Sequence, residues 1–214
     1  MKNKKYQLIA LIGKAGSGKD TILKDVVRAY ELPMNIIVSY TTRPMREGET
    51  EGKEYHFKMA HPENTEEILS LYQSAMGTEG CTWDETYPSR ETIAKDFANQ
   101  ALFIIEDRAH KIAGAISIDE DTEVNALTCW SKQLEPSAEL ARLVIRETEQ
   151  NHGLARIMIQ NTMEELKKRG MKGVHFLVSK TNERAMRSYQ KLNFTKCGES
   201  DLYGEDWWCY EKAL

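Results

Sequence analysis

The chain alternates apolar runs of strand length with segments whose apolar positions recur at helical spacing. Asn64, with Glu67 three residues later, predicts the capped start of one helix, and Ser89 predicts the cap of the next. Beyond residue 57 the pattern predicts helices over 64–76, 89–99, 155–170 and 182–192, and strands over 101–107, 111–119, 138–147, 174–179 and 206–214. Such alternation predicts an α/β or α+β fold with a mixed sheet.

The first apolar run, residues 6–12, is followed at once by a glycine-rich turn, and a helical pattern begins at Lys19. Glycines between a strand and a helix let backbone N–H groups converge on phosphate oxygens, and the lysine adds a full positive charge. Asp20 stands where Ser or Thr normally meets Mg²⁺, and Thr21 comes one position late. The residues predicted to hold a nucleotide phosphate are Gly13, Gly16, Gly18, Lys19, Asp20 and Thr21.

The stretch SYTTRPMREGETEGKEYHF over residues 39–57 resembles guanylate kinase. The resemblance implies that Ser39, Arg43, Arg46 and Tyr55 would hold the phosphate of GMP, and paired guanidinium groups suit phosphate oxygens. The resemblance ends at about residue 58, and no metal-binding acid or arginine-bearing lid can be placed after it. We therefore expect a truncated strand–phosphate loop–helix–strand segment, for which binding of ATP or GMP is a doubtful expectation.

Charge and composition narrow the classes of function. Residues 1–58 carry a net charge of +4 and residues 59–214 a net charge of −8, which argues against a broad nucleic-acid surface on the larger part. No run of 18 or more apolar residues occurs, so no membrane span is expected. The four cysteines are scattered without a Cys-x-x-Cys pair, which predicts reduced thiols in a cytoplasmic protein and no metal site.

A second turn between a strand and a helix lies at residues 150–155, with the sequence QNHGLA. Small residues at a helix N-terminus make a second site suited to a diphosphate. Gln150-x-x-Gly153-x-Ala155 is similar to the acyl-CoA-binding motif of the GNAT N-acetyltransferases. The segment NERAMRSYQKLNF is similar to the second signature of that family at Asn182, Ala185, Tyr189, Lys191 and Phe194, with Asn193 in place of glycine.

The second resemblance covers about residues 57–214 and implies a GNAT-like fold, whose mixed, mostly antiparallel sheet is flanked by helices. The implied cofactor is acetyl-CoA, with its diphosphate on the turn and its pantetheine along the neighbouring strand edge. Tyr189 would protonate the leaving thiolate, and Asn182 would bond the cofactor arm. The implied cofactor-binding residues are Leu143, Val144, Ile145, Gln150, Asn151, His152, Gly153, Leu154, Ala155, Asn182 and Tyr189.

The implied general base is Glu139, whose alternation along its strand would place it on the face of Ala141, Leu143 and Ile145. Glu147 and Glu149 are interpreted as solvated loop charges. Because neither motif contains a cysteine, direct attack by the amine in a ternary complex is expected. The loop with Trp83, Glu85 and Tyr87 is expected to shape the pocket for a small-molecule or peptide amine.

The expected domains are 1–56, the truncated guanylate-kinase-like segment, and 57–214, the acetyltransferase, in a monomer or homodimer. Residues 55–60 belong to both resemblances, so we expect the two parts to pack together through a shared strand. Two alternatives to an acetyltransferase stay open at this point. One is a nucleotide-binding regulator or kinase, and the other is a binder of coenzyme A or nucleotide without catalytic activity.

Overall fold

The computed structural model describes residues 55–107 and 109–214, together with the single helical residue Val26. The chain divides into two compact units, Met1–Pro44 and Met45–Leu214, and every described residue except Val26 belongs to the second. The predicted phosphate loop, Ser39, Arg43 and Arg46 lie outside the described residues, as does the expected packing of the two parts.

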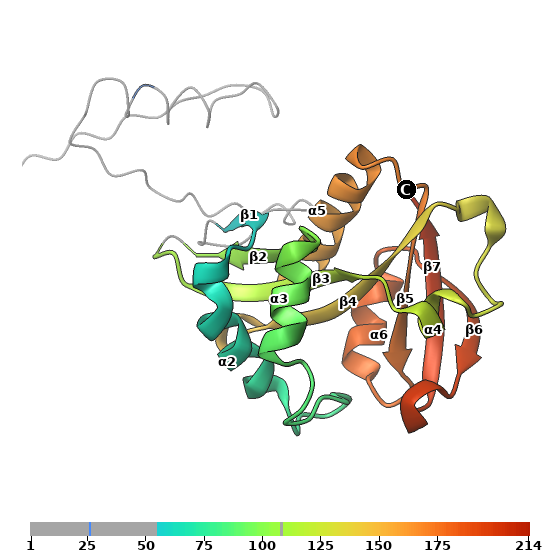
Figure 1. Ribbon diagram of the computed structural model, residues 1–214, viewed down its shortest axis with the longest axis horizontal. Helices are drawn as coiled ribbons and strands as arrows, with labels where there is room; N and C mark the ends of the chain where they lie inside the picture. The colour runs from blue at the N-terminus through green and yellow to red at the C-terminus, as the bar shows by residue number, and fades with distance from the viewer. Residues whose placement is uncertain (1–25, 27–54, 108) are drawn as a thin grey trace, which may run out of the picture. The chain divides into compact units, whose positions relative to one another are not determined.

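The second unit is built on a seven-stranded sheet with the order β1-β2-β3-β4-β5-β7-β6 (Figure 1). Neighbouring strands are antiparallel except β4 and β5, which are parallel, so the predicted mixed, mostly antiparallel sheet is confirmed. The strands are β1 (His56–Met59), β2 (Leu102–Glu106), β3 (Ile112–Asp119), β4 (Ser137–Ile145), β5 (Gly173–Ser179), β6 (Thr195–Ser200) and β7 (Trp207–Ala213).

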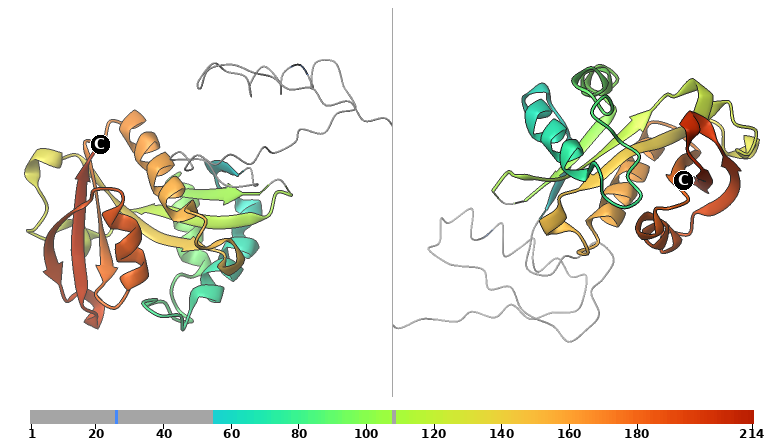
Figure 2. Two further views of the ribbon diagram at one scale, coloured as in Figure 1. Left: turned by 180° about the vertical axis from the view of Figure 1, so that it is seen from behind. Right: turned by 90° about the horizontal axis from the view of Figure 1, so that it is seen from below.

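Helices cover both faces of the sheet, as the view from below in Figure 2 shows. On one face α2 (Thr65–Ala75) and α3 (Arg90–Ala98) pack their buried residues over β2, β3 and β4. On the other, α5 (Leu154–Lys168) and α6 (Glu183–Gln190) pack over a larger core. The shorter helices are α4 (Thr122–Asn125), η1 (Pro62–Asn64), η2 (Lys132–Leu134), η3 (Glu147–Glu149) and η4 (Leu202–Gly204). Among the described residues, no helix combines the length and the apolar character that crossing a bilayer requires.

The two predicted helix caps have different outcomes. Ser89 caps α3 as predicted, since its hydroxyl accepts a hydrogen bond of 3.2 Å from the backbone N–H of Thr92. The capping box predicted for Asn64 and Glu67 is wrong. Asn64 ends a 3-10 helix and has a helical backbone, so its side chain turns back to accept from the N–H of His61.

Two differences from the predicted elements have local causes. β6 was not predicted, because its sequence TKCGES has no apolar alternation and pairs only with β7 at the edge of the sheet. The strand predicted over 138–147 ends at Ile145, because η3 follows directly. The expectation that residues 55–60 supply the first strand of the sheet is confirmed, since β1 pairs with β2.

A β-bulge at Arg142 changes which residues of β4 share a face. Arg142 has a φ of 49°. Ala141 pairs with Ser117 of β3 and Val144 pairs with Ala115, so β4 has two residues between these pairs where β3 has one. The predicted common face of Glu139 with Leu143 and Ile145 is therefore wrong. After the extra residue, the alternation restarts, and Val144 joins the core beneath α2 and α3 while Leu143 and Ile145 pack on the opposite core.

Candidate active site

A cleft of about 1330 Å³ opens where β4 and β5 separate. The two strands pair only between Ser137–Glu139 and Gly173–His175, so no described strand pairs with the later part of β4 on that side. Arg146 donates its backbone N–H to Ala113 of β3. Because backbone groups alternate along a strand, the N–H of Ile145 faces the open edge. The predicted edge Leu143, Val144 and Ile145 does line this cleft.

The turn that follows β4 presents unused backbone donors at one end of the cleft. Asn151 and Gly153 have φ values of 65° and 80°, which turn successive N–H groups outward before α5 begins at Leu154. Within the described part of the chain, no backbone carbonyl accepts from the N–H groups of residues 151–155. The side chain of Gln150 donates 2.8 Å to the carbonyl of Ile145, so it braces the turn against the strand.

Basic side chains from α5 and α6 line the cleft on the side of this turn. We call the set the basic side: Arg156, Arg184, Arg187 and Lys191. Arg184 lies 3.5 Å from the side-chain oxygen of Asn151, so this contact joins α6 to the turn. The exposed side chain of His152 does not line the cleft, although its backbone belongs to the turn. The sequence analysis assigned none of these four residues to the cofactor site, although Lys191 belongs to the second signature.

Asn182 and the loop before α3 meet across the cleft. The side-chain oxygen of Asn182 accepts 2.9 Å from the N–H of Ala185 and caps α6, and its amide donates 3.2 Å to the carbonyl of Gly80. Gly80 has a φ of 77°, and a Cβ there would lie 2.6 Å from the backbone of Asn182. The amide keeps one further N–H that is free to donate into the cleft.

Tyr189 lies among aromatic rings at the floor of the cleft. Its ring centroid is 4.4 Å from that of Phe176 and 6.3 Å from that of Phe194. Burial raises the pKa of the Tyr189 hydroxyl to about 12. The hydroxyl therefore keeps its proton over the whole physiological range, as a proton donor must. Asn193, in the glycine place of this motif, has a φ of 56°, as its left-handed role predicts.

Glu139 is the most unusual carboxyl group of the cleft. It is 7% exposed, and its Oε2 is the one buried side-chain oxygen or nitrogen among the described residues that has no hydrogen-bond partner. Burial, followed by the nearby charges of Asp119 and Asp121, raises the pKa of the Glu139 carboxyl to about 8. A group with this pKa exchanges its proton close to neutral pH, which suits a general base.

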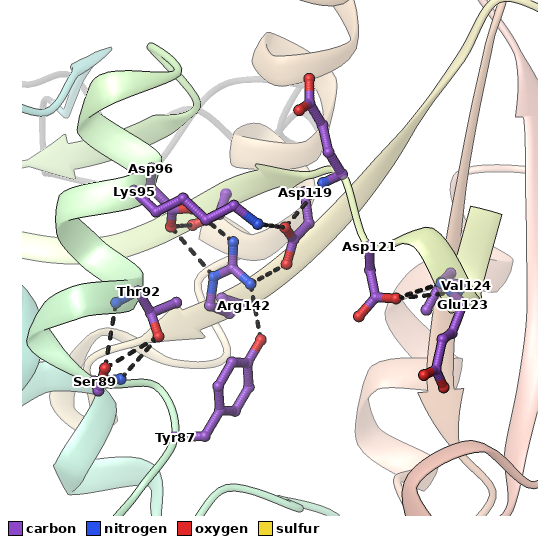
Figure 3. A network of polar contacts seen from close by, with 12 residues as sticks. Tyr87, Ser89, Thr92, Lys95, Asp96, Asp119, Asp121, Glu123, Val124 and Arg142 are labelled. Carbon is purple, nitrogen blue, oxygen red and sulfur yellow. Dashed lines mark hydrogen bonds and ion pairs between the residues drawn. The ribbon is translucent and has the colours of Figure 1, made fainter.

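Arg142, at the bulge, ties the cleft to α3 and to the loop before it (Figure 3). Its guanidinium lies 2.8 Å from Asp96 and also pairs with Asp119. It donates 2.8 Å to the hydroxyl of Tyr87, and Ser117 donates 2.8 Å to Asp96. This network fixes the position of Tyr87 over the cleft. The sequence signal for this network was Arg142 itself, a charged residue within the apolar run AELARLVI.

Carboxyl groups from several elements line the same cleft as Glu139, and Asp119 and Asp121 lie close enough to raise its pKa. We call the set the acidic side: Glu79, Asp84, Glu91, Asp96, Asp119, Asp121, Glu139 and Glu205. Trp83 and Tyr87 line the cleft here, as expected of the loop that carries them. Glu85 does not line it, and the neighbouring Asp84 does. Among the described residues, no group of three or more His, Cys, Asp or Glu is arranged to hold a metal ion.

Tyr55 connects the guanylate-kinase motif to the turn after β4. Its hydroxyl donates 2.5 Å to Oε2 of Glu149, which lies 94 residues further along the chain. The interpretation of Glu149 as a solvated charge is therefore wrong, whereas Glu147 is exposed as expected. The prediction failed because the long-range partner of Glu149 comes from the far edge of the sheet.

Comparison with known proteins finds two family matches, which overlap over residues 65–72. The family model described as acetyltransferase (GNAT) family matches residues 65–194, and that described as guanylate kinase matches residues 5–72. Guanylate kinases of Rhodopirellula baltica and Lactiplantibacillus plantarum are 37% and 40% identical to this chain over 57 and 67 residues. These matches cover 27% and 31% of this chain but only 27% and 32% of the relatives, so the chain spans about a quarter to a third of their length.

Similar solved structures are acetyltransferases. One from Streptococcus agalactiae, of the GNAT family, has a TM-score of 0.64 at 18% identity over 78% of this chain and 98% of its own. The ribosomal-protein-S18-alanine N-acetyltransferase from Escherichia coli has a TM-score of 0.58 at 17% identity over 75% and 94%. The NatC complex bound to Gag peptide and CoA has a TM-score of 0.59 at 14% identity over 75% and 99%. At these identities the likeness shows the fold.

The family model covers more than half of the chain, and it spans most of the residues that line the cleft, the turn after β4 and all of the second signature. The fold found in the solved structures agrees with it. This chain therefore belongs to the GNAT family of acetyltransferases.

Proposed function

We propose that the protein transfers the acetyl group of acetyl-CoA to an amine of a small molecule or peptide, by direct attack of that amine. One observation carries the proposal. A single cleft joins a turn of free backbone N–H groups and an open strand edge to a buried carboxyl group that has an unpartnered oxygen. The first two features suit an anionic, extended cofactor, and the third suits an acceptor amine that gives up its proton to the carboxyl group.

The residues present fit acetyl-CoA. The N–H groups of residues 151–155 and the basic side would hold its phosphates, and the edge Leu143–Ile145 would pair with its pantetheine arm. When bound, acetyl-CoA supplies an activated acyl group as a thioester. The outward N–H of Ile145 is available to donate a hydrogen bond to the carbonyl oxygen of that group.

Glu139 is proposed as the general base. An amine attacks only when it is neutral, and the Glu139 carboxylate, alone or through a water molecule, accepts the proton that the amine loses. With a pKa of about 8, part of the Glu139 carboxyl group is ionised near neutral pH. Its affinity for a proton is also higher than that of an ordinary carboxylate, as a base for an amine requires. Tyr189 is proposed as the acid that returns a proton to the leaving thiolate, since its hydroxyl stays protonated at these pH values.

Direct attack is favoured over an acyl-enzyme. Cys81 is the cysteine that lines the cleft among the described residues, and burial raises the pKa of its thiol. A thiol with a raised pKa is largely protonated at neutral pH and is a poor nucleophile. Peptide acceptors are supported by two neighbours, whose names include a ribosomal-protein alanine and a bound Gag peptide.

The division into 1–56 and 57–214 is likewise a proposal, supported by the two sets of motifs; the two family matches also give two parts but overlap over residues 65–72. A second candidate function, binding of GMP or ATP by the first part, rests on the guanylate-kinase match to residues 5–72. A shift in melting temperature on adding GMP, or ATP with Mg²⁺, would support it, and no shift would argue against it.

Thiol release in an acceptor screen tests the main proposal. With acetyl-CoA and a panel of amines, we expect acceptor-dependent release of free thiol by the wild-type protein. Tyr189→Phe should lower kcat by roughly 10²-fold or more while leaving acetyl-CoA affinity unchanged. A wild-type protein that neither binds acetyl-CoA nor releases thiol with any amine would contradict the proposal.

A further inference from the structure

The two sides of the cleft carry opposite charge. The acidic side holds eight carboxylates and the cations Lys95 and Arg142, whereas the basic side holds four cations, with Glu149 beside them. The basic side suits the phosphates of the cofactor, so the acidic side faces the acceptor. The acceptor therefore meets a strongly negative surface, which attracts cations and repels carboxylates.

Most of this negative charge is not neutralised within the protein. Arg142 pairs with Asp96 and Asp119, and Lys95 also pairs with Asp119. No described cation forms an ion pair with Glu79, Asp84, Glu91, Asp121 or Glu205. Glu139 has no ion-pair partner either, but its carboxyl group is mostly protonated at neutral pH and adds little charge. Surface carboxylates alone would not define a site, but Glu139 is not on the surface.

The buried side chain of Glu139 is a second observation, besides the surface charge, that indicates a bound ligand. Its side chain is more than nine-tenths buried, it lines the cleft, and its Oε2 has no donor. Buried carboxyl oxygens nearly always have a partner, because an unpaired one costs free energy. An N–H group of a bound acceptor would complete this site.

Asp121 is the carboxylate best placed to bind a second charge beside Glu139. Its charge helps to raise the pKa of the Glu139 carboxyl group, so the two groups lie close together, and its own Oδ1 accepts 2.8 Å from the N–H of Glu123 and caps α4. Its Oδ2 accepts 2.7 Å from the hydroxyl of Tyr203. A carboxylate has about four acceptor positions, so Asp121 is held in place and still able to bind an ammonium group.

We infer that the acceptor is a linear diamine or polyamine, whose reacting amine lies at Glu139 and whose second ammonium group lies at Asp121. The inference rests on the proposed function and names its substrate class. The amine that reacts must be neutral, so it cannot be the cation that the acidic side attracts. A second amine, which stays protonated, supplies that positive charge. The ring of Tyr203, which is 58% exposed and lines the cleft, adds an aromatic face for that ammonium group.

Two contacts across the cleft favour a slender acceptor over a protein surface. Asn182 joins α6 to the loop at Gly80, and Tyr203 joins the loop between β6 and β7 to Asp121. Both contacts bring separate loops together beside the acceptor side of the cleft. A linear chain of methylene groups can pass between such loops along Trp83 and Tyr87, which line the same side.

The test uses the full-length protein, saturating acetyl-CoA and three matched sets of acceptors. These are linear α,ω-diamines of increasing length, monoalkylamines of the same lengths, and ω-amino acids of the same lengths. We expect kcat/KM for the best diamine to exceed that of its matched monoamine by about tenfold or more. The ω-amino acid, with a carboxylate in place of the second amine, should be the poorest of the three.

Asp121→Asn assigns the preference to its residue. Asparagine still caps α4 but carries no charge, so the variant should lose most of the preference for diamines while keeping its affinity for acetyl-CoA. The matched control is Glu164→Gln on α5, an exposed carboxylate that does not line the cleft, and it should keep the full preference. The comparison of acceptors with the wild-type protein decides the question even if Asp121→Asn does not fold.

Equal kcat/KM for diamines and monoamines would overturn the inference, as would an unchanged preference in a folded Asp121→Asn variant. Turnover of peptides with none of the diamines would overturn it as well. All three results leave the proposed acetyltransferase standing. Absence of acetyl-CoA binding, together with absence of thiol release for every amine and peptide, would remove both.

Discussion

Arg142 and Asp96 form an ion pair of 2.8 Å in which both side chains are almost fully buried, at 2% and 3% exposure. The pair joins the bulge of β4 to α3 (Figure 3), and the charge of Arg142 also acts on the Glu139 carboxyl group. Bringing both charges out of water is costly, and each compensates the other. The bulge and the network around Arg142 therefore support the base and the loop that carries Tyr87.

Replacing Arg142 with methionine should destabilise the protein by about 3 kcal/mol or more, because Asp96 would stay buried without its partner. Urea unfolding measures the change in free energy. Lys95→Met is the matched control, since Lys95 is 59% exposed and its nitrogen lies 3.8 Å from Asp119. Its cost should stay below about 1 kcal/mol. Equal costs for the two variants would show that the buried network does not stabilise the fold.

Replacing Glu139 with glutamine should lower kcat by about 10²-fold or more, because glutamine accepts no proton. Acetyl-CoA affinity should not change. The wild-type kcat should rise with pH through about 8, the pKa set by burial and by Asp119 and Asp121 against the opposing charge of Arg142. Steady-state kinetics between pH 6 and pH 10 check this. A variant with unchanged kcat and the same pH profile would exclude Glu139 as the base.

Glu139 should also make stability depend on pH. Its pKa is about 8 when folded, against an ordinary value of 4.5, so the folded protein holds a proton that the unfolded chain releases. Its contribution to stability is full below about pH 4.5 and is lost as the pH rises through 8. Glu139→Gln should therefore melt higher than wild type at pH 8, by a margin that shrinks towards pH 5. A margin that is the same at both pH values would show that the pKa of Glu139 is ordinary.

Replacing Gly153 with alanine should weaken acetyl-CoA binding. Gly153 has a φ of 80°, and a Cβ there would lie 3.1 Å from the guanidinium of Arg156, at the turn proposed to hold the diphosphate. Gly170→Ala is the matched control, because its φ of 85° brings a similar strain of about 1 kcal/mol into open space. Calorimetric titration should show several-fold weaker binding for the first variant alone. Equal affinities would remove the turn from the cofactor site.

The sequence was sufficient for most of the second unit. Apolar periodicity placed the long helices and the central strands within a few residues, since their buried faces repeat regularly. β6 was not predicted, because it is an edge strand of mostly polar residues. The cap at Asn64 failed because a 3-10 helix precedes α2, and the cap rule assumes an extended residue at that place.

The candidate site was predictable where it follows local motifs. The turn after β4, Tyr189 and Asn182 all line the cleft, and local signatures had singled them out. The surroundings of Glu139 were not predictable, because the bulge at Arg142 reverses the alternation of β4 without a glycine or proline to announce it. The acidic side also joins residues far apart in sequence, from the loop before α3 to the loop before β7, which only the tertiary fold brings together.

The most direct test of the account is the response of the backbone amide resonances to added coenzyme A. The account predicts saturable shifts for the N–H groups of Asn151 to Ala155 and of Ile145, where donors are free or face the open edge, and none at Gly170. Coenzyme A that leaves the resonances of this turn unmoved, whether it binds elsewhere or not at all, would contradict the account.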